Sequence, residues 1–410
     1  MNDHPVPAHP GKPLRRSIVL VALLFFMTMG YGTVTTPLWP LYQERDGFGP
    51  TMVTVIFSMY TLGTVLTLLF AGSLSDRFGR TRVLALAAAI GVLSIAVFLL
   101  WDAVPGLMLA RTIQGVGVGL TASTATAAIV ELAHAGAARN PRSTATALST
   151  VANLGGLGAG ALIGGLISEW FPAPLAGPFL FYGATLSLAA VSMMFVQDTT
   201  PTAPPPAAPS PAKPAKRRRL EVPAGHARRY FGASALGLTA FATFGMFTSL
   251  VPVILVGDLQ VRSRILAGAM VLLVMGVAAL SQLLVANRSP QALSVAGVVL
   301  YPLGWALTAI AVGTSSLAMF VLAALVGGAS AGLLFSAGSA TVDSVADADQ
   351  RAGAHAGFFL LAYLGMAVPV IGLAALSVVT GNLWAVLVFG ALLSITAVAG
   401  STQVRASRDR

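Results

Sequence analysis

Four charged residues stand close together in the stretch GSLSDRFGRTR, residues 72–82: Asp76, Arg77, Arg80 and Arg82. The chain has 410 residues, of which only 9% are charged, and long apolar runs flank this stretch on both sides. A carboxylate beside guanidinium groups forms charge-assisted hydrogen bonds, which connect neighbouring segments and can be broken again. Because cations alone would be enough to orient a membrane protein, the acid Asp76 and the glycine at position 72 need a further explanation.

A second stretch whose side chains could take part in binding or coupling is ARTIQGVGVG, which contains Arg111, Gln114 and Gly115. Arg111 lies inside an apolar segment, where a charge costs about 2.5–3.5 kcal/mol on insertion scales and is therefore treated as functional. Two interpretations stay open. Either Arg111 takes part in energy coupling or substrate contact, or its long side chain extends from near the helix end to the lipid headgroups.

The sequence offers no enzymatic constellation. It contains no H-E-x-x-H motif, no nucleophile elbow and no Walker loop, and its five histidines are scattered. Cysteine is absent, which excludes disulfides and cysteine metal sites. The sequence therefore predicts a protein that is not an enzyme and that uses no cofactor or metal.

The segments that hold these residues are apolar enough to lie in lipid. Hydrophobic residues make up 56% of the chain, and its mean hydropathy is +0.82. In lipid only helices and closed barrels satisfy every backbone group, and the apolar runs are too long and alternate too little for barrel strands. We expect an all-α membrane protein with twelve spans, at residues 17–42, 50–72, 83–101, 106–130, 144–168, 174–196, 229–257, 264–285, 291–312, 315–340, 352–378 and 381–400.

The lysines and arginines predict the orientation of these spans. With the N-terminus in the cytoplasm, twenty of the 24 lysines and arginines fall on the cytoplasmic side, three fall outside, and Arg111 lies within a span. Short cytoplasmic loops are enriched in these residues. We expect a multi-pass protein of the plasma or inner membrane with both termini in the cytoplasm. The same rule explains the net charge of +10, so no nucleic-acid partner is expected.

A proline-rich, basic segment divides the chain into two halves. Residues 197–228 contain eight prolines and cannot form a packed core. The two halves form a weak internal repeat with an offset of 212 residues, in which Pro40 aligns with Pro252. Internal repeats of this kind indicate a transporter whose binding site lies between its halves. The expected parts are a cytoplasmic tail at 1–16, a six-helix bundle at 17–196, a cytoplasmic linker at 197–228, a second six-helix bundle at 229–400 and a tail at 401–410.

The 72–82 stretch resembles the loop motif G-x-x-x-D-R-x-G-R-R/K of the major facilitator superfamily. The matching residues are Gly72, Asp76, Arg77, Gly79, Arg80 and Arg82. The resemblance implies the twelve-span fold with two pseudo-symmetric bundles, in which the first glycine lets span two approach a neighbour closely. It also implies that Asp76 lies against the start of span eleven near Arg351, and that Arg80 reaches Glu131. These contacts would latch the halves in an outward-facing state and break in an inward-facing one.

Two further runs resemble motifs of the twelve-span drug:proton antiporter branch of this family. The motif R-x-x-Q-G-x-G of proton-coupled members is matched by Arg111, Gln114 and Gly115. The antiporter motif G-x-x-x-G-P-x-x-G-G is matched in span five by Gly156, Gly160, Gly164 and Gly165. Ala161 stands where that motif has proline. Glycines four residues apart also allow close helix packing by themselves, so both roles stay open.

The resemblance places the substrate cavity between spans one, four, seven and ten, with additions from spans five and eleven. The polar and aromatic candidates are Tyr31, Thr35, Gln114, Thr121, Asn153, Phe244, Phe247, Thr248 and Tyr363. Such a lining suits a small amphiphilic organic compound. Because no acid lies in the middle of a span, a proton would be carried by Asp76, Glu131, Glu44 or Asp46, or coupling would act through Arg111.

Together these features predict a secondary active transporter that works by alternating access. The first hypothesis is proton-coupled efflux of amphiphilic compounds, with the proton gradient as energy source. The alternative is import or facilitated diffusion of a small metabolite. A receptor or a membrane enzyme is disfavoured, because the chain shows neither a soluble module nor clustered titratable groups. The expected partners are a small-molecule substrate and membrane lipids, and the expected form is a monomer.

Overall fold

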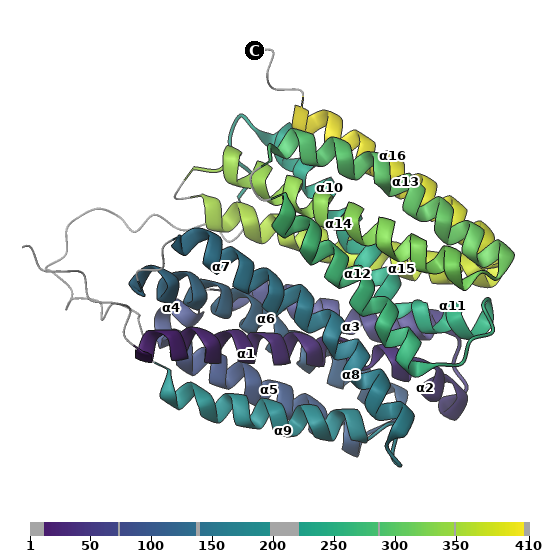
Figure 1. Cartoon of the computed structure of the whole chain (residues 1–410), viewed down its shortest axis with the longest axis horizontal. Helices are drawn as coiled ribbons and strands as arrows, with labels where there is room; N and C mark the ends of the chain where they lie inside the picture. Colours follow the sequence, from purple (N-terminus) through teal and green to yellow (C-terminus); the bar gives the residue numbers. More distant parts are fainter. Residues whose placement is uncertain are drawn as a thin grey trace, which may run out of the picture.

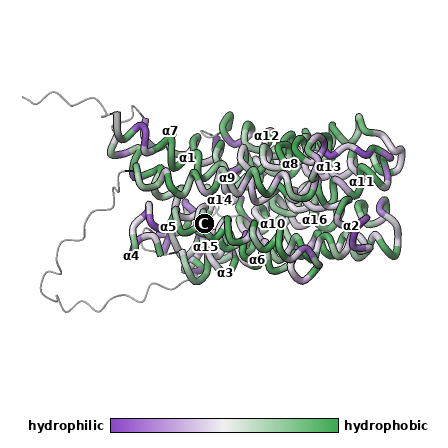
Figure 2. The backbone as a smooth tube through the Cα atoms, turned by 90° about the horizontal axis from the view of Figure 1, so that it is seen from below, coloured by the Kyte–Doolittle hydropathy of each residue, from purple (hydrophilic) through white to green (hydrophobic). Residues whose placement is uncertain are grey.

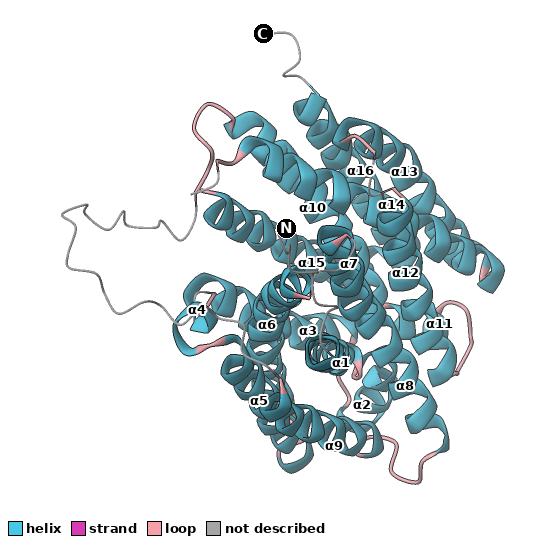
Figure 3. Cartoon of the chain, turned by 60° about the vertical axis from the view of Figure 1, so that its left-hand side comes forward, coloured by secondary structure: helices cyan, strands magenta, loops and turns pink. Residues whose placement is uncertain are grey.

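The computed structural model describes residues 12–72, 74–136, 140–196, 221–285, 288–347 and 350–405. Helices fill almost all of this part of the chain, and no strand occurs within it (Figure 3). The first half contains α1 (Lys12–Thr33), η1 (Thr36–Leu38), α2 (Trp39–Asp46), α3 (Pro50–Phe70), α4 (Leu74–Phe78), α5 (Arg80–Leu100), α6 (Val104–Ala135), α7 (Pro141–Thr150), η2 (Val151–Gly155), α8 (Gly156–Trp170), α9 (Gly177–Ser192) and η3 (Met193–Phe195). The second half contains α10 (Ala227–Ser249), α11 (Val251–Gly257), α12 (Arg264–Leu284), α13 (Pro290–Thr314), α14 (Leu317–Val345), α15 (Arg351–Thr380) and α16 (Asn382–Arg405).

Twelve helical segments of the described chain are long and apolar enough to cross a membrane, and they correspond one to one to the twelve expected spans. Four helices extend five residues beyond the expected limits, since α1 begins at Lys12, α6 ends at Ala135, α14 ends at Val345 and α16 ends at Arg405. A helix satisfies its own backbone groups and can therefore continue from the apolar core of the membrane into the headgroup region. Most of the expected linker, residues 197–220, lies outside the described part of the chain.

The surface of the helices is as apolar as a lipid environment requires. Figure 2 shows apolar residues along the length of the helices and hydrophilic segments gathered at the two ends of the molecule. Large apolar side chains such as Leu188, Val299 and Ile395 point outward and are largely exposed. A surface of this kind marks a membrane or partner contact rather than water, so the helices present the belt that membrane insertion needs.

The helices form two bundles, one from each half of the chain (Figure 1). The bundles meet along two lines, where α8 packs on α12 and α3 packs on α15. One end of the molecule, here named the terminal end, is where α1 begins, α4 lies and α16 ends (Figure 1). The opposite end, here named the far end, holds α2 and α11, which contact each other across the bundle interface.

Polar contacts between the bundles are found toward the far end, as judged from the described side chains. Glu169 Oε2 accepts hydrogen bonds from the backbone nitrogen and from Nε of Arg264, at 3.3 and 3.1 Å. Thr36 Oγ1 donates to the carbonyl oxygen of Thr248 at 2.8 Å. These two threonines are 212 residues apart, the offset of the internal repeat, so they occupy equivalent positions in the two bundles. Their contact indicates that the pseudo-two-fold axis that relates the two bundles passes between these two residues.

Glycines let helix backbones approach closely both within and between the bundles. A Cβ on Gly160 would lie 1.9 Å from the carbonyl oxygen of Gly30, and one on Gly115 would lie 2.0 Å from that of Tyr60. Both contacts are inside the N-terminal bundle. A Cβ on Gly165 would instead lie 2.4 Å from the carbonyl oxygen of Arg264, in the other bundle. The glycine run of span five therefore serves both bundle packing and closure of the far end.

Span five is not one continuous α-helix. A π-helical turn, η2, separates α7 from α8 and includes Asn153. Single π-helical turns inside α-helices are frequently found at functional sites. The glycine run begins at Gly156, directly after this turn, so the irregular backbone and the close helix contacts adjoin each other.

Candidate functional site

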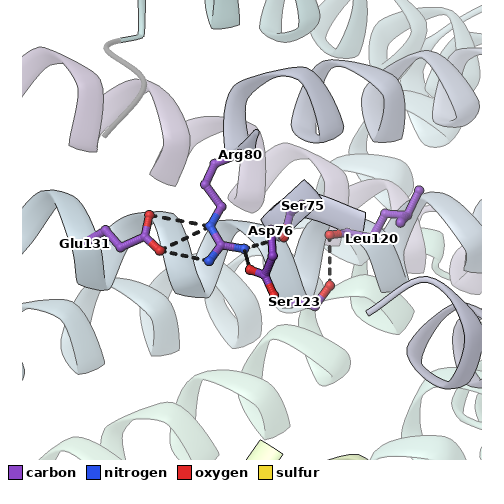
Figure 4. Close-up of polar contacts among 6 residues, drawn as sticks. All are labelled: Ser75, Asp76, Arg80, Leu120, Ser123 and Glu131. Carbon is purple, nitrogen blue, oxygen red and sulfur yellow. Dashed lines mark hydrogen bonds and ion pairs between the residues drawn. The ribbon is translucent and has the colours of Figure 1, made fainter. Parts of the chain in front are cut away.

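A charged cluster at the terminal end, called the latch after its expected role, consists of Asp76, Arg80 and Glu131 (Figure 4). Asp76 lies in the short helix α4, and Arg80 begins α5 directly after Gly79. Gly79 has φ +92°, a conformation that disfavours residues with a Cβ. This turn brings Arg80 back beside Asp76, four residues earlier, so the glycine of the motif has a positioning role.

Arg80 holds both acids of the latch at once (Figure 4). Its Nη1 lies 2.6 Å from Asp76 Oδ1, and its Nη2 lies 2.8 Å from Glu131 Oε1 on α6. Nη1 also donates to the hydroxyl of Ser75. The Arg80 side chain is only 14% exposed, so the guanidinium is largely shielded from water and its contacts are screened less than those of a surface pair. The contact between Arg80 and Glu131 that the family resemblance implies is present.

The resemblance implies a contact of Asp76 with the start of span eleven, but none is found among the residues that the structure describes. Arg351 instead has an acid in its own bundle, since its Nε lies 3.9 Å from Asp343 Oδ1. The Asp76 side chain is 54% exposed and pairs with Arg80. The two halves of the expected latch are therefore each held inside their own bundle, as the resemblance implies for an inward-facing state.

The other residues of the 72–82 motif lie at the surface. Arg77 and Arg82 are exposed, and the guanidinium carbon of Arg77 lies 5.4 Å from the centroid of the Phe78 ring. A Cβ on Gly72 would meet only the carbonyl oxygen of Leu68 in its own span, at 3.1 Å. The expectation that Gly72 allows close approach of a neighbouring helix is therefore wrong here, because Gly63 and Gly115 form that contact between α3 and α6.

Arg111 is completely buried inside the N-terminal bundle. Its Nη1 donates to the carbonyl oxygen of Gly32 at 3.0 Å, to Thr35 Oγ1 at 3.2 Å and to Gln114 Oε1 at 2.6 Å. Gln114 in turn donates from Nε2 to the carbonyl oxygen of Tyr31 at 2.6 Å. The hypothesis that Arg111 extends to the headgroups is wrong, because these contacts direct it toward α1 and η1 instead.

Aromatic rings take the place of a carboxylate around this buried cation. The guanidinium carbon of Arg111 lies 4.8 Å from the centroid of Tyr60, 5.1 Å from that of Phe57 and 6.0 Å from that of Trp39. The negative face of an aromatic ring attracts a cation, and the attraction is strongest when water is excluded. Because its hydrogen bonds reach Gly32 and Thr35, the position of α1 relative to α6 determines how this charge is stabilised.

Most of the expected cavity residues are buried between the helices. Seven of them are buried, namely Tyr31, Thr35, Gln114, Thr121, Phe244, Phe247 and Thr248. Asn153 and Tyr363 are partly buried. Tyr31 bonds to Ser94 at 2.7 Å, inside its own bundle. The polar groups of these spans thus also serve contacts with neighbouring helices, and the shared cavity lining stays a prediction.

A narrow crevice lies in the C-terminal bundle between α10, α13 and α14. Its lining consists of Thr243, Met246, Phe247, Tyr301, Gly304, Trp305, Thr308, Ala323 and Gly327. At the repeat offset of 212 residues, Ala323 is the counterpart of Arg111, and Gly327 is the counterpart of Gly115. Equivalent positions of the internal repeat therefore hold a buried cation in the N-terminal bundle and line an apolar crevice in the C-terminal bundle.

Sequence reasoning missed two polar contacts that the structure shows. One is the pair Glu169–Arg264, which joins the bundles at the far end and could have been found from an acid that ends span five and a cation that begins span eight. The other is the contact of Asp343 with His355, with Nε2 and Oδ1 3.0 Å apart. The signal for it was the repeat offset, which makes Asp343 the counterpart of Glu131.

The fold and its charged sites define a class: α-helical membrane proteins made of two six-helix bundles that face each other. The family model for the Major Facilitator Superfamily matches residues 20–370. The chain therefore belongs to the major facilitator superfamily, whose members are transporters rather than enzymes.

Individual relatives and structures agree with this assignment. The chain is 30% identical over 142 residues to an arabinose-proton symporter of Bacillus subtilis (strain 168), covering 32% of this chain and 31% of that protein. It is 29% identical over 177 residues to the cephamycin export protein CmcT of Amycolatopsis lactamdurans, covering 41% and 36%. The alignments thus span about a third of each relative's length. A solved structure of a bacterial homologue of the human lysosomal transporter Spinster superposes on this chain with a TM-score of 0.72 at 13% identity. The superposition covers 96% of this chain and 97% of that one, and that structure is in an inward-facing and unoccupied conformation.

Proposed function

We propose that this protein moves a small amphiphilic organic compound across the cell membrane by alternating access, with its terminal end in the cytoplasm. The observation that carries this proposal is the uneven distribution of contacts between the bundles. At the far end Glu169–Arg264, Thr36–Thr248 and the backbone contact of Gly165 join the two bundles. At the terminal end the latch and the pair Arg351–Asp343 each lie within one bundle. This arrangement corresponds to an inward-facing state, in which these contacts join the bundles at the far end and leave them unjoined at the terminal end.

We further propose that transport is proton-coupled efflux by a monomer surrounded by lipid. The similarity to a cephamycin export protein supports export, and the similarity to an arabinose-proton symporter supports a proton as the coupled ion. The latter also supports the alternative, in which the protein imports a small metabolite. Both directions use the same two bundles, so the direction is a question for transport experiments.

The proposal is tested by accumulation of fluorescent amphiphiles in cells that express the protein, with and without a proton-gradient uncoupler. Efflux predicts low accumulation that rises to the level of control cells when the uncoupler is added. Accumulation above that of control cells, abolished by the uncoupler, would instead establish import. The same accumulation in expressing and control cells, for a panel of cationic, neutral and anionic compounds, would contradict transport of this substrate class.

We propose that Arg111 belongs to the coupling machinery, because it links α6 to α1 through a charge without a carboxylate partner among its described contacts. Replacing buried ionic groups by apolar residues of similar volume is often neutral for folding when no unpaired charge is left behind, and the described contacts of Arg111 include no carboxylate. Arg111→Met should therefore remain folded but lose gradient-driven transport by roughly tenfold, the effect of about 1.4 kcal/mol of lost coupling.

Transport by purified protein in liposomes with an imposed pH gradient measures this effect, and thermal unfolding monitors the fold. Arg111→Lys keeps the positive charge and should keep part of the activity, although an ammonium does not reproduce the geometry of guanidinium. Gradient-driven transport by folded Arg111→Met at the original rate would show that Arg111 only serves packing.

A further inference from the structure

A cluster of three titratable or charged side chains lies where α14 ends and α15 begins. Asp343 Oδ1 is 3.0 Å from His355 Nε2 and 3.9 Å from Arg351 Nε. Asp343 belongs to the last turn of α14, while Arg351 and His355 belong to the first turns of α15. The His355 side chain is 24% exposed and that of Asp343 is 54% exposed. The cluster is therefore reachable from water at the terminal end.

The internal repeat relates this cluster to the latch of the other bundle. Asp343 is the counterpart of Glu131 at the offset of 212 residues. Glu131 receives its cation, Arg80, from the turn between spans two and three. At the corresponding position the second half carries Ala292, and Asp343 receives its cations from α15 instead. Asp343, the acid of the C-terminal bundle, thus contacts α15, the helix that Asp76 would approach when the terminal end closes.

Of the three side-chain types in this cluster, imidazole is the one that ordinarily titrates between about pH 5 and about pH 8. With His355 neutral, Asp343 and Arg351 together carry no net charge, and protonation of His355 adds one positive charge at the start of α15. The N-terminus of a helix carries a partial positive charge of its own. Protonation therefore makes the start of α15 a stronger site for an approaching carboxylate.

The charged neighbours of this cluster are few in the described structure. Asp347 follows α14, and the first turn of α10, which packs on α15, carries Arg228 and Arg229. Tyr230 donates from its hydroxyl to the carbonyl oxygen of Ala354 at 2.9 Å, which fixes α10 against this turn. The edge of the His355 ring contacts the ring of Phe358 with centroids 6.3 Å apart. None of these groups removes His355 from contact with Asp343.

We infer that the His355–Asp343 pair is a proton-binding site that controls closure of the terminal end. This inference rests on the proposed alternating-access function and adds a site to it. When His355 is protonated, the start of α15 attracts Asp76 and the terminal end closes. When His355 is neutral, Asp343 and Arg351 balance each other and the bundles separate there.

Distance measurements between two spin labels at the terminal end test this site. The chain has no cysteine, so labels can be placed at Met194→Cys and Leu284→Cys, two strongly exposed positions at the terminal ends of the two bundles. Between about pH 8.5 and about pH 5.5, which bracket the ordinary histidine pKa, the short-distance population should grow roughly fivefold or more. His355→Gln should keep the distances of high pH throughout.

His134→Gln is the matched control, because His134 also lies at the terminal end and its Nδ1 contacts only the Val130 carbonyl of its own helix, 2.7 Å away. It should leave the pH response unchanged. A pH response of the same size in His355→Gln would overturn the inference while leaving alternating access intact. A terminal end that never closes, at any pH or with a substitution that opens the far end, would instead contradict the proposed function itself.

Discussion

Gly165→Val should hold the far end of the transporter open. A Cβ at this position would lie 2.4 Å from the carbonyl oxygen of Arg264 and 3.2 Å from the Cα of Ile265, both in the other bundle. Backbone atoms of α12 cannot yield as a flexible side chain would, so the bundles must separate. The ion pair Glu169–Arg264, with both side chains about 30% exposed, contributes only about 0.2–1 kcal/mol and cannot oppose such a clash.

Chemical labelling measures this opening. Thr36 is 1% exposed and lies in the far-end contact, so a single cysteine at Thr36→Cys should react slowly with a membrane-impermeant thiol reagent. In the Gly165→Val background the labelling rate should rise by roughly tenfold or more, as expected for a population shift of about 1.4 kcal/mol.

Two other glycines of the interface helices provide controls. Gly276 lies on α12, and a Cβ at this position would have no neighbouring atom within 4 Å, so Gly276→Ala should change neither labelling nor folding. A Cβ on Gly160 would clash with the backbone of Gly30 in its own bundle, so Gly160→Val should reduce the amount of folded protein instead of opening the far end. Slow labelling of Thr36→Cys in a folded Gly165→Val protein would show that this contact does not close the far end.

Asp76→Asn should abolish most transport while the protein still inserts and folds. The carboxylate pairs with Arg80 in this structure, and in the proposed cycle it also docks at the start of α15 when the terminal end closes. An amide keeps the shape of the side chain but loses the charge that a helix N-terminus and nearby cations attract. A coupling of about 1–3 kcal/mol corresponds to a loss of roughly 5–150-fold.

The transport rate per folded molecule measures this loss. Asp102→Asn neutralises another exposed carboxylate, which pairs with Arg45 at the far end at 2.7 Å, and should transport almost normally because a surface pair contributes little. Asp76→Asn that transports at the rate of Asp102→Asn would show that the charge at position 76 is not needed for the conformational cycle.

The spans and the core of the latch could be predicted from the sequence. A membrane helix needs about twenty apolar residues whatever its neighbours are, and therefore all twelve spans follow from local composition. The pair Arg80–Glu131 followed from the motif and from an acid at the end of span four. The extension of α1 and α16 could not be predicted, because polar residues tolerate both helix and coil outside the apolar core.

Side-chain direction within the spans was the part that the sequence could not provide. Arg111 lies near a helix end in the sequence, which allowed an extended side chain, but the rings of Phe57 and Tyr60 come from another helix and only packing reveals them. Thr248 and Tyr31 are buried for the same reason. A polar side chain in a span forms hydrogen bonds with the nearest available group. Which group is nearest depends on the rotation of the helix about its axis, which a single sequence does not specify.

The central claim is that the two bundles rock, so that one end opens as the other closes. Spin labels at Leu100→Cys and Val379→Cys report the far end, and labels at Met194→Cys and Leu284→Cys report the terminal end; all four positions are strongly exposed. Introducing Gly165→Val should lengthen the far-end distance and shorten the terminal-end distance in the same protein. Distances that lengthen at both ends, or a far-end change with no change at the terminal end, would contradict the account.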